Sequence, residues 1–291
     1  MERAADRLIG ILNVNKPKGW TSHDVVAKVR RLASQKRVGH AGTLDPMAEG
    51  VLPILLGRAT RLADFIQLGR KTYVATLQLG VATDTDDAEG AVIAESPIPQ
   101  LSEAALEAVL ENFRGEILQT PPQYSALKVA GQRAYAVARA GGEVALAPRP
   151  VTIDDLRIKT WSEAELSLEV TCSKGTYIRA LARDIAVSLG TVGHMTKLVR
   201  TKVGAFQLED ALTPDELASR GFSNALLPAT NALPDAARRS VTEEEAARLA
   251  NGQAVPVAGL RADHVWVYDP SGRLVCLASA DGTLLRPRIA L

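Results

Sequence analysis

The chain of 291 residues contains only two cysteines, Cys172 and Cys276, which lie far apart in the sequence. Neither belongs to a Cys-x-x-Cys pair or to a cluster of cysteine and histidine. This spacing argues against a structural zinc site and against a disulfide framework. We therefore expect both cysteines to behave as small buried hydrophobic residues.

Long hydrophobic runs are also missing, and no stretch of the sequence has the length and composition of a transmembrane helix. The first six residues carry two acids and no apolar segment of the signal-peptide type. We therefore expect a cytoplasmic protein that makes no membrane contact. Hydrophobic residues make up 46% of the chain, enough for the core of one large domain accompanied by a small one.

The motifs that usually mark cofactor sites are absent. The sequence has neither the G-x-G-x-x-G pattern of dinucleotide-binding folds nor the G-x-x-x-x-G-K pattern of phosphate-binding loops. Residues 84–90 are acidic and could be mistaken for a calcium loop. Counting from Asp84, however, the sixth position is Glu89, where an EF-hand requires glycine. We expect an acidic turn at this place, no metal site and no cofactor.

Net charge is only +1, but the charges are unevenly distributed. Residues 1–72 contain thirteen Lys and Arg against six Asp and Glu, whereas residues 83–116 contain one Arg against nine acids. Residues 117–150 are again basic, with four bases and one acid. Phosphate contacts dominate nucleic-acid affinity, so local basic segments favour a phosphate-rich partner. The alternative is an ordinary solvated surface.

A shaped loop is predicted at residues 37–53, which contain three glycines and two prolines. Asp45 lies in this loop between Leu44 and Pro46, and the proline biases its backbone toward an extended conformation. A carboxylate on a stiff backbone is suited to preorganised attack on a substrate. Asp-Pro is also a common way to open a turn, so the dipeptide alone leaves both interpretations open.

The whole string at residues 39–53, Gly-His-Ala-Gly-Thr-Leu-Asp-Pro-Met-Ala-Glu-Gly-Val-Leu-Pro, resembles the catalytic motif of the TruB family of bacterial tRNA pseudouridine-55 synthases. In that family the aspartate is the essential nucleophile, so the resemblance implies that Asp45 is catalytic. It also implies that His40 fills the gap left by a flipped nucleotide and that Gly42 lies against the RNA.

Two further strings resemble motifs of the same family. Lys-Pro-Lys-Gly-Trp-Thr-Ser, beginning at Lys16, resembles the first motif, which supports the catalytic loop. We expect Lys16 to help bind RNA, with an ordinary turn lysine as the alternative. Lys-Thr-Tyr-Val-Ala-Thr-Leu-Gln-Leu-Gly, beginning at Lys71, resembles the second motif, whose tyrosine stacks on the target base. The resemblance makes Tyr73 a catalytic residue, whereas a strand tyrosine on its own is usually core packing.

Residues 172–184, Cys-Ser-Lys-Gly-Thr-Tyr-Ile-Arg-Ala-Leu-Ala-Arg-Asp, resemble the third motif of the family. Its arginine pairs with the catalytic aspartate, which implies that Arg179 holds Asp45, since a nearby positive charge favours the ionised carboxylate. Lys174 in the same string is expected to contact RNA. Farther on, Leu198 and Arg200 match the Leu-x-Arg of the family, whose leucine packs under the target base.

The resemblance also implies the fold class, an α+β protein. Its catalytic domain, residues 1–238, is expected to contain a mixed, largely antiparallel β-sheet flanked by helices, with an RNA-clamping insertion at about residues 120–150. Residues 239–291 are expected to form a small β-rich, PUA-like RNA-binding domain. Period-two alternation from Lys71 to Leu79 predicts one strand of the sheet, and residues 228–240 are typical of a linker.

The implied reaction is the isomerisation of a T-loop uridine of tRNA to pseudouridine after base flipping, with the T-arm stem-loop as partner. No cofactor, no obligate protein partner and a monomer are expected. The sequence leaves open whether Asp45 attacks C6 of uracil or C1′ of ribose. A non-catalytic RNA-binding or RNA-folding protein is the main alternative. A glycoside hydrolase is a weaker one, because it should show a second acid across the cleft.

Overall fold

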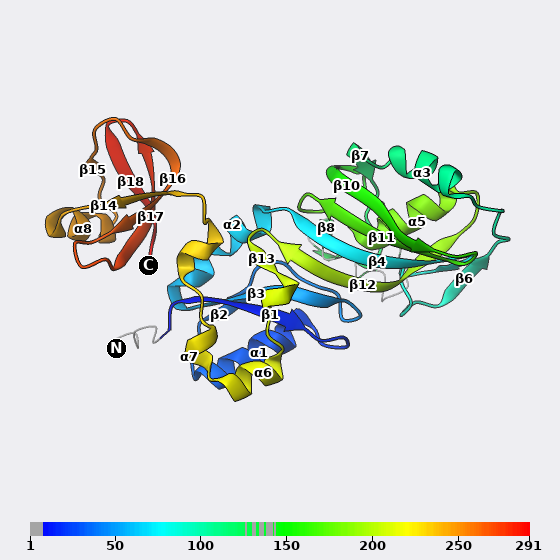
Figure 1. Ribbon diagram of the computed structural model, residues 1–291, viewed down its shortest axis with the longest axis horizontal. Helices are drawn as coiled ribbons and strands as arrows, with labels where there is room; N and C mark the ends of the chain where they lie inside the picture. Colours follow the sequence, from blue (N-terminus) through cyan, green and yellow to red (C-terminus); the bar gives the residue numbers. More distant parts are fainter. Residues whose placement is uncertain (1–7, 126, 130–131, 134–136, 138–141, 143) are drawn as a thin grey trace.

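The structure is a computed structural model that describes residues 8–125, 127–129, 132–133, 137, 142 and 144–291. Figure 1 shows an elongated molecule in which a small β-rich unit, at the C-terminal end of the chain, lies beside a larger α+β unit. Part of the expected RNA-clamping insertion at residues 120–150 falls outside the described residues.

One large mixed sheet forms the centre of the larger unit. Its main strands run in the order β1, β3, β12, β4, β11, β10, β7, while β2 pairs with β3 and β13 pairs with β12. The strands are β1 (Gly10–Lys16), β2 (Val38–His40), β3 (Glu49–Leu56), β4 (Lys71–Leu79), β7 (Gly115–Gln119), β10 (Arg149–Trp161), β11 (Glu165–Cys172), β12 (Gly193–Val203) and β13 (Phe206–Gln207). Among these paired strands only β3 and β12 run parallel, so the sheet is largely antiparallel.

Strand β4 matches the predicted alternation. Every second residue from Lys71 to Leu79 is buried, including Tyr73. Beside it, β12 pairs with β4 on one side and with the start of β3 on the other. At this junction Gly50 has φ of +105°, and a Cβ there would lie 2.2 Å from the carbonyl oxygen of Arg200. Only glycine therefore lets the chain leaving the Asp45 loop approach β12 so closely.

Helices lie beside the large sheet near both of its ends, close to β1 and close to β10 (Figure 1). The α-helices of this unit are α1 (Ser22–Ala33), α2 (Ala63–Leu68), α3 (Glu103–Glu111), α5 (Ile178–Ser188), α6 (Pro214–Arg220) and α7 (Phe222–Ala225). Thr21 caps the first helix: its side chain accepts a hydrogen bond from the backbone N–H of Asp24, while the Asp24 carboxylate accepts one from the backbone of Thr21. The 3-10 segments are Gly57–Leu62, Leu208–Asp210 and Ala229–Ala232, and the short hairpins are β5 (Val81–Thr83) with β6 (Val92–Glu95) and β8 (Lys128–Val129) with β9 (Gln132–Arg133).

A second, five-stranded sheet forms the C-terminal unit, in the order β14, β16, β17, β18, β15. Its elements are β14 (Ala237–Ser240), α8 (Glu243–Ala250), β15 (Val255–Pro256), β16 (Arg261–Tyr268), β17 (Leu274–Asp281) and β18 (Leu284–Ala290). Buried residues of this sheet, notably Trp266, share a hydrophobic cluster with Ile11 and Val51 of the larger unit. The two units are therefore joined by an apolar contact.

The prediction that residues 228–240 form a linker is wrong, because this segment is packed and partly regular. Ala229 and Ala232 are buried in that shared cluster, and the last four residues form β14. The indole N–H of Trp266 donates to the carbonyl oxygen of Leu233 at 2.9 Å, which fixes the segment further. The polar composition and Pro234 predict a linker. The sequence does not show that Ala229 and Ala232 pack into a hydrophobic cluster.

Two other expectations concern burial and membranes. Cys172 and Cys276 are free and buried, as predicted. Burial raises the pKa of the Cys172 thiol to about 11 and that of Cys276 to about 12. Among the described residues, no helix is long and apolar enough to cross a membrane.

Candidate active site

A cleft of about 520 Å³ opens where the Asp45 loop meets the centre of the large sheet. Six of the predicted site residues line it: Gly42, Asp45, Tyr73, Lys174, Arg179 and Leu198. They come from the loop between β2 and β3, from β4 and β12, and from the turn and first helical residues leading into α5. Segments far apart in the sequence therefore converge on one cavity.

At one side of the cleft, Asp45 forms an ion pair with Arg179. The guanidinium Nε of Arg179 lies 3.0 Å from Oδ2 of Asp45. The side chain of Asp45 is 39% exposed, whereas that of Arg179 is only 7% exposed. The carboxylate can therefore be reached from the cleft while its cationic partner stays shielded from water.

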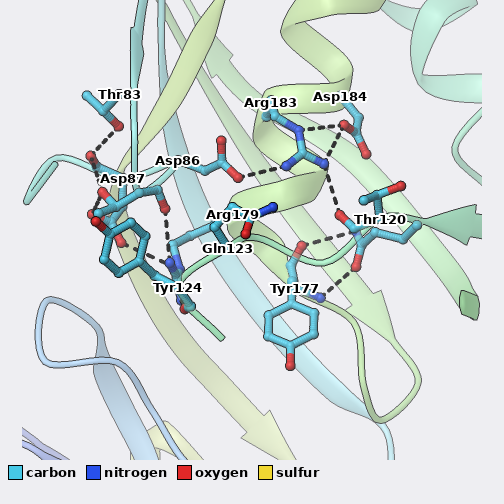
Figure 2. Close-up of polar contacts among 12 residues, drawn as sticks. Thr83, Asp86, Asp87, Thr120, Gln123, Tyr124, Tyr177, Arg179, Arg183 and Asp184 are labelled. Carbon is cyan, nitrogen blue, oxygen red and sulfur yellow. Dashed lines mark hydrogen bonds and ion pairs between the residues drawn. The ribbon is translucent and has the colours of Figure 1, made fainter. Parts of the chain in front are cut away.

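Arg179 is held by further groups from two other segments (Figure 2). Its Nη1 donates to the carbonyl oxygen of Thr85 at 2.9 Å, and its Nη2 donates to that of Tyr124 at 3.0 Å. Its Nε also lies 3.5 Å from Oδ2 of Asp87. Each guanidinium nitrogen thus has a partner, and the planar group can take only a narrow range of orientations.

Asp87 is a site residue that the sequence pattern did not indicate. Its carboxylate is buried, and its Oδ1 accepts hydrogen bonds from the Thr85 hydroxyl at 2.6 Å and from the backbone N–H of Glu89 at 3.0 Å. These bonds leave Oδ2 facing Arg179. The run of acids at residues 84–90 predicts only a turn. The motif arginine, Arg179, is the signal that could have pointed to Asp87, because a buried guanidinium needs counter-charge.

Lys16 lies beneath the Asp45 loop, not on an RNA-facing surface. Its side chain has no exposed area, and its ammonium donates to the carbonyl oxygens of Trp20 at 2.6 Å, Pro17 at 3.0 Å and Pro46 at 3.2 Å. Burial lowers the pKa of Lys16 to about 8. We therefore correct the expectation that Lys16 binds RNA directly. Lys16 instead supports the loop, because it binds the carbonyl oxygen of Pro46, the residue after Asp45.

Arg200 supports the same loop from the sheet. Its Nε donates to the carbonyl oxygen of Val51 at 2.7 Å, and its Nη2 donates to that of Gly42 at 3.0 Å. Arg200 is almost fully buried, on the strand position opposite Tyr73. One guanidinium therefore joins both ends of the Asp45 loop to β12. The Leu-x-Arg pattern marked Arg200 but did not indicate this role.

Tyr73 and Leu198 form an apolar surface inside the cleft from neighbouring strands β4 and β12. Both side chains are buried, and burial raises the pKa of the Tyr73 hydroxyl, so the phenol is neutral near pH 7. A flat aromatic ring and a leucine at the same cavity can hold a planar ring by stacking and apolar contact.

His40, at the end of β2, does not line the cleft. Its Nδ1 is buried without a hydrogen-bond partner, and its ring lies edge-on to that of His23 with centroids 5.7 Å apart. Burial, followed by the neighbouring His23 and Arg200, lowers the pKa of His40. The ring is therefore neutral near pH 7, beside the loop that carries Asp45.

The conserved-domain model of the "TruB family pseudouridylate synthase (N terminal domain)" matches residues 30–178, which include Asp45 and Tyr73. The chain belongs to the TruB family. The models of the tRNA pseudouridylate synthase B C-terminal domain and of the tRNA pseudouridine synthase II C-terminal domain match residues 179–232 and 237–290.

Relatives with the name tRNA pseudouridine synthase B are similar over nearly the whole chain. The protein of Thermobifida fusca is 46% identical over 278 residues, covering 92% of this chain and 94% of its own. That of Synechocystis is 43% identical over 296 residues, covering 98% and 100%. As a TruB family member, this protein is a tRNA pseudouridine synthase, an isomerase.

Two solved structures have a similar fold. A Cbf5-Nop10-Gar1 complex contains a chain that matches with a TM-score of 0.74 and 25% identity, covering 97% of this chain and 84% of that one. An H/ACA RNP bound to a substrate RNA containing 2′-deoxyuridine matches with a TM-score of 0.73, 25% identity and the same coverage. The α+β architecture with a C-terminal β-rich domain is therefore that of pseudouridine synthases.

In this TruB family site, the groups at the cleft that could act on a substrate include the Asp45 carboxylate, the Arg179 guanidinium and the Tyr73 phenol. Within the part of the chain that the structure describes, no cluster of three or more His, Cys, Asp or Glu side chains could hold a metal ion. The chemistry that this arrangement can perform is therefore attack by, or charge stabilisation from, Asp45 on a planar substrate in the cleft.

Proposed function

We propose that the protein isomerises a uridine in the T-loop of tRNA to pseudouridine, with Asp45 as the nucleophile. The observation that carries this proposal is the pair of Asp45 and the shielded Arg179, at 3.0 Å, in a cleft that also contains Tyr73. Family membership supports tRNA as the substrate. The choice of the T-loop rests on the resemblance of the motifs.

Each group in the cleft has a separate task in this proposal. Arg179 aligns the Asp45 carboxylate, which can then attack the nucleotide at C6 of uracil or C1′ of ribose. The bond from ribose C1′ to uracil N1 breaks, the base turns, and C1′ joins C5. The hydrogen of C5 is lost as a proton and N1 gains a proton, so atoms and charge balance without any redox change.

The base must leave the folded loop before it can enter the cleft, at a cost of a few kcal/mol. Stacking on Tyr73 and contact with Leu198 would offset part of this cost inside the cleft. We assign His40, which lies beside the Asp45 loop, to the gap left in the RNA. Lys174 is exposed at the cleft, where it could hold a backbone phosphate, with Gly42 against the nucleotide.

The proposal also covers the rest of the chain. We assign catalysis to residues 1–238, with an RNA-clamping insertion at about residues 120–150. We assign RNA binding to residues 239–291 as a PUA-like domain. We also assign the activity to a monomer that acts on the T-arm without a protein partner. A tRNA substrate would place the enzyme in the cytoplasm.

The test uses an unmodified tRNA transcript and a matched transcript in which the T-loop uridine is replaced by cytidine. After incubation with the purified protein, pseudouridine is located by carbodiimide labelling and primer extension. We expect one modified position in the first transcript and none in the second. Modification elsewhere in both transcripts would contradict the T-loop assignment, and no modification in either would contradict the function.

A further inference from the structure

The acidic turn that holds Arg179 is itself held by a second ion pair. Nη1 of Arg183 lies 2.8 Å from Oδ2 of Asp86 (Figure 2). From this geometry we propose that Asp86 and Arg183 are positioning residues for the reaction, acting through Arg179 on Asp45. This inference rests on the proposed function and adds two residues that never touch the substrate.

Asp86 has an unusual backbone conformation. Its φ is +60°, and Ser34 is the other non-glycine residue with positive φ among the described residues. The left-handed region costs a residue with a side chain of the order of 1 kcal/mol, so such a residue persists only where its surroundings fix it. Strain of this kind is concentrated at functional sites.

The strained residue lies between Thr85 and Asp87, two of the residues that contact Arg179. Thr85 gives its carbonyl oxygen to Nη1 of Arg179, and Asp87 places Oδ2 beside Nε. The left-handed turn at Asp86 lets a carbonyl and a carboxylate from residues on either side of it converge on the same guanidinium.

Arg183 fastens this turn to two other parts of the molecule. It lies one helical turn after Arg179 on α5, so both arginines project from the same side of the helix. Besides Asp86, it donates through Nη2 to the carbonyl oxygen of Thr120 at 3.0 Å and through Nε to Asp184 at 2.9 Å. The guanidinium therefore joins helix α5, the acidic turn and the segment that leads to Tyr124.

The ion pair of Asp86 and Arg183 is partly shielded from water. The side chain of Asp86 is 14% exposed and that of Arg183 is 29% exposed, and burial raises the pKa of the Asp86 carboxyl. Loss of Arg183 would leave a partly buried carboxylate without its partner, which costs more than loss of a surface pair. The turn could then relax from its strained conformation and move Thr85 and Asp87 away from Arg179.

A shift of about 1 Å in a group that aligns a nucleophile can reduce a rate by about 100-fold. We therefore expect Arg183→Met and Asp86→Asn each to lower the single-turnover rate of pseudouridine formation by about 10- to 100-fold. The affinity for tRNA should change by less than about 3-fold, because neither side chain lines the cleft and most phosphate contacts would remain. Arg183→Lys should recover part of the rate.

The experiment measures single-turnover rates and tRNA affinity for the wild type, both single variants and the double variant. Arg157→Met is the matched control, because Arg157 pairs with Asp155 on the exposed face of β10. If the two residues act as one unit, the double variant should be no slower than the slower single variant. The control should react at the rate of the wild type.

The Asp86→Gly variant separates the effect of the ion pair from that of backbone strain, because glycine adopts the left-handed region freely. This variant should therefore fold even if Arg183→Met does not. It should still be slow, because the carboxylate is gone. Rates equal to the control in any folded variant of the pair, or losses that multiply in the double variant, would overturn the inference. If the wild type forms no pseudouridine, it is the proposed function that fails instead.

Discussion

Nε of Arg179 lies 3.0 Å from Oδ2 of Asp45 although the two residues are far apart in the sequence. The guanidinium belongs to the first turn of α5, and the carboxylate belongs to the loop between β2 and β3. Because Arg179 also binds Thr85 and Asp87, the position of the carboxylate is tied to the acidic turn. This connection gives the site its rigidity.

Arg179 should therefore be sensitive even to a change that keeps its charge. Arg179→Ala should reduce the single-turnover rate severely, by at least 100-fold, since a small misalignment alone costs about that much. Arg179→Lys should recover only part of the loss, because an ammonium lacks the planar fork that reaches Thr85 and Tyr124 together. Full activity of the lysine variant would show that charge alone is needed.

His40 should contribute by its size and not by proton transfer. Its pKa is lowered by burial, so the ring stays neutral through the physiological range. His40→Gln, which keeps much of the volume, should retain substantial activity, and His40→Ala should lose more. The pH profile of the single-turnover rate should be the same in all three proteins between about pH 6 and 8. A loss in His40→Gln as deep as that in Asp45→Asn would make His40 a chemical participant.

Lys16 should give the protein a characteristic pH dependence of stability. Its pKa is about 8 in the folded state against 10.5 for an ordinary lysine, so between these values the unfolded chain binds more protons than the folded one. The contribution of Lys16 to the free energy of unfolding therefore rises with pH across that window. In Lys16→Met, urea unfolding from pH 8 to 10 should show a smaller rise than in the wild type. Equal slopes would contradict the lowered pKa.

Affinity for tRNA should fall steeply with salt. Residues 1–72 contain thirteen Lys and Arg, and Lys174 is exposed at the cleft. If six or more phosphates are neutralised, the association constant should fall by about 1,000-fold or more between about 50 and 200 mM salt. Filter binding or anisotropy over this range gives the slope directly. An affinity that does not change with salt would remove the role given to the basic segments.

Much of the fold could be predicted from local pattern. The alternation from Lys71 to Leu79 fixed a half-buried strand, and β4 has those bounds. At the start of α1, Thr21 and Asp24 form a reciprocal cap, which involves residues only three positions apart. These features depend on neighbouring residues, which is why sequence alone identifies them.

Features that depend on distant partners could not be predicted in the same way. The motif that begins at Lys16 predicts an RNA contact for this lysine, yet its ammonium donates to three carbonyl oxygens beneath the loop. Ala229 and Ala232 belong to the same hydrophobic cluster as Trp266, a residue whose place in the sequence does not indicate this contact.

The site was predicted only as far as the family resemblance reached. Asp45 and Arg179 were paired through their motifs, and the structure brings them together. Asp87, by contrast, lay in a run of acids with no recognisable spacing, and its value as a counter-charge depends on the buried Arg179 beside it. Long-range electrostatic partners of this kind require coordinates.

The most direct test of the central claim is the rate of pseudouridine formation by Asp45→Asn on an unmodified tRNA transcript, measured together with binding. Asparagine keeps the size and shape of the side chain but cannot act as a carboxylate nucleophile. We expect no detectable product, with tRNA affinity within about 3-fold of the wild type, since Asp45 contributes little to the phosphate contacts that dominate affinity. Appreciable turnover by this variant would show that Asp45 is not the nucleophile.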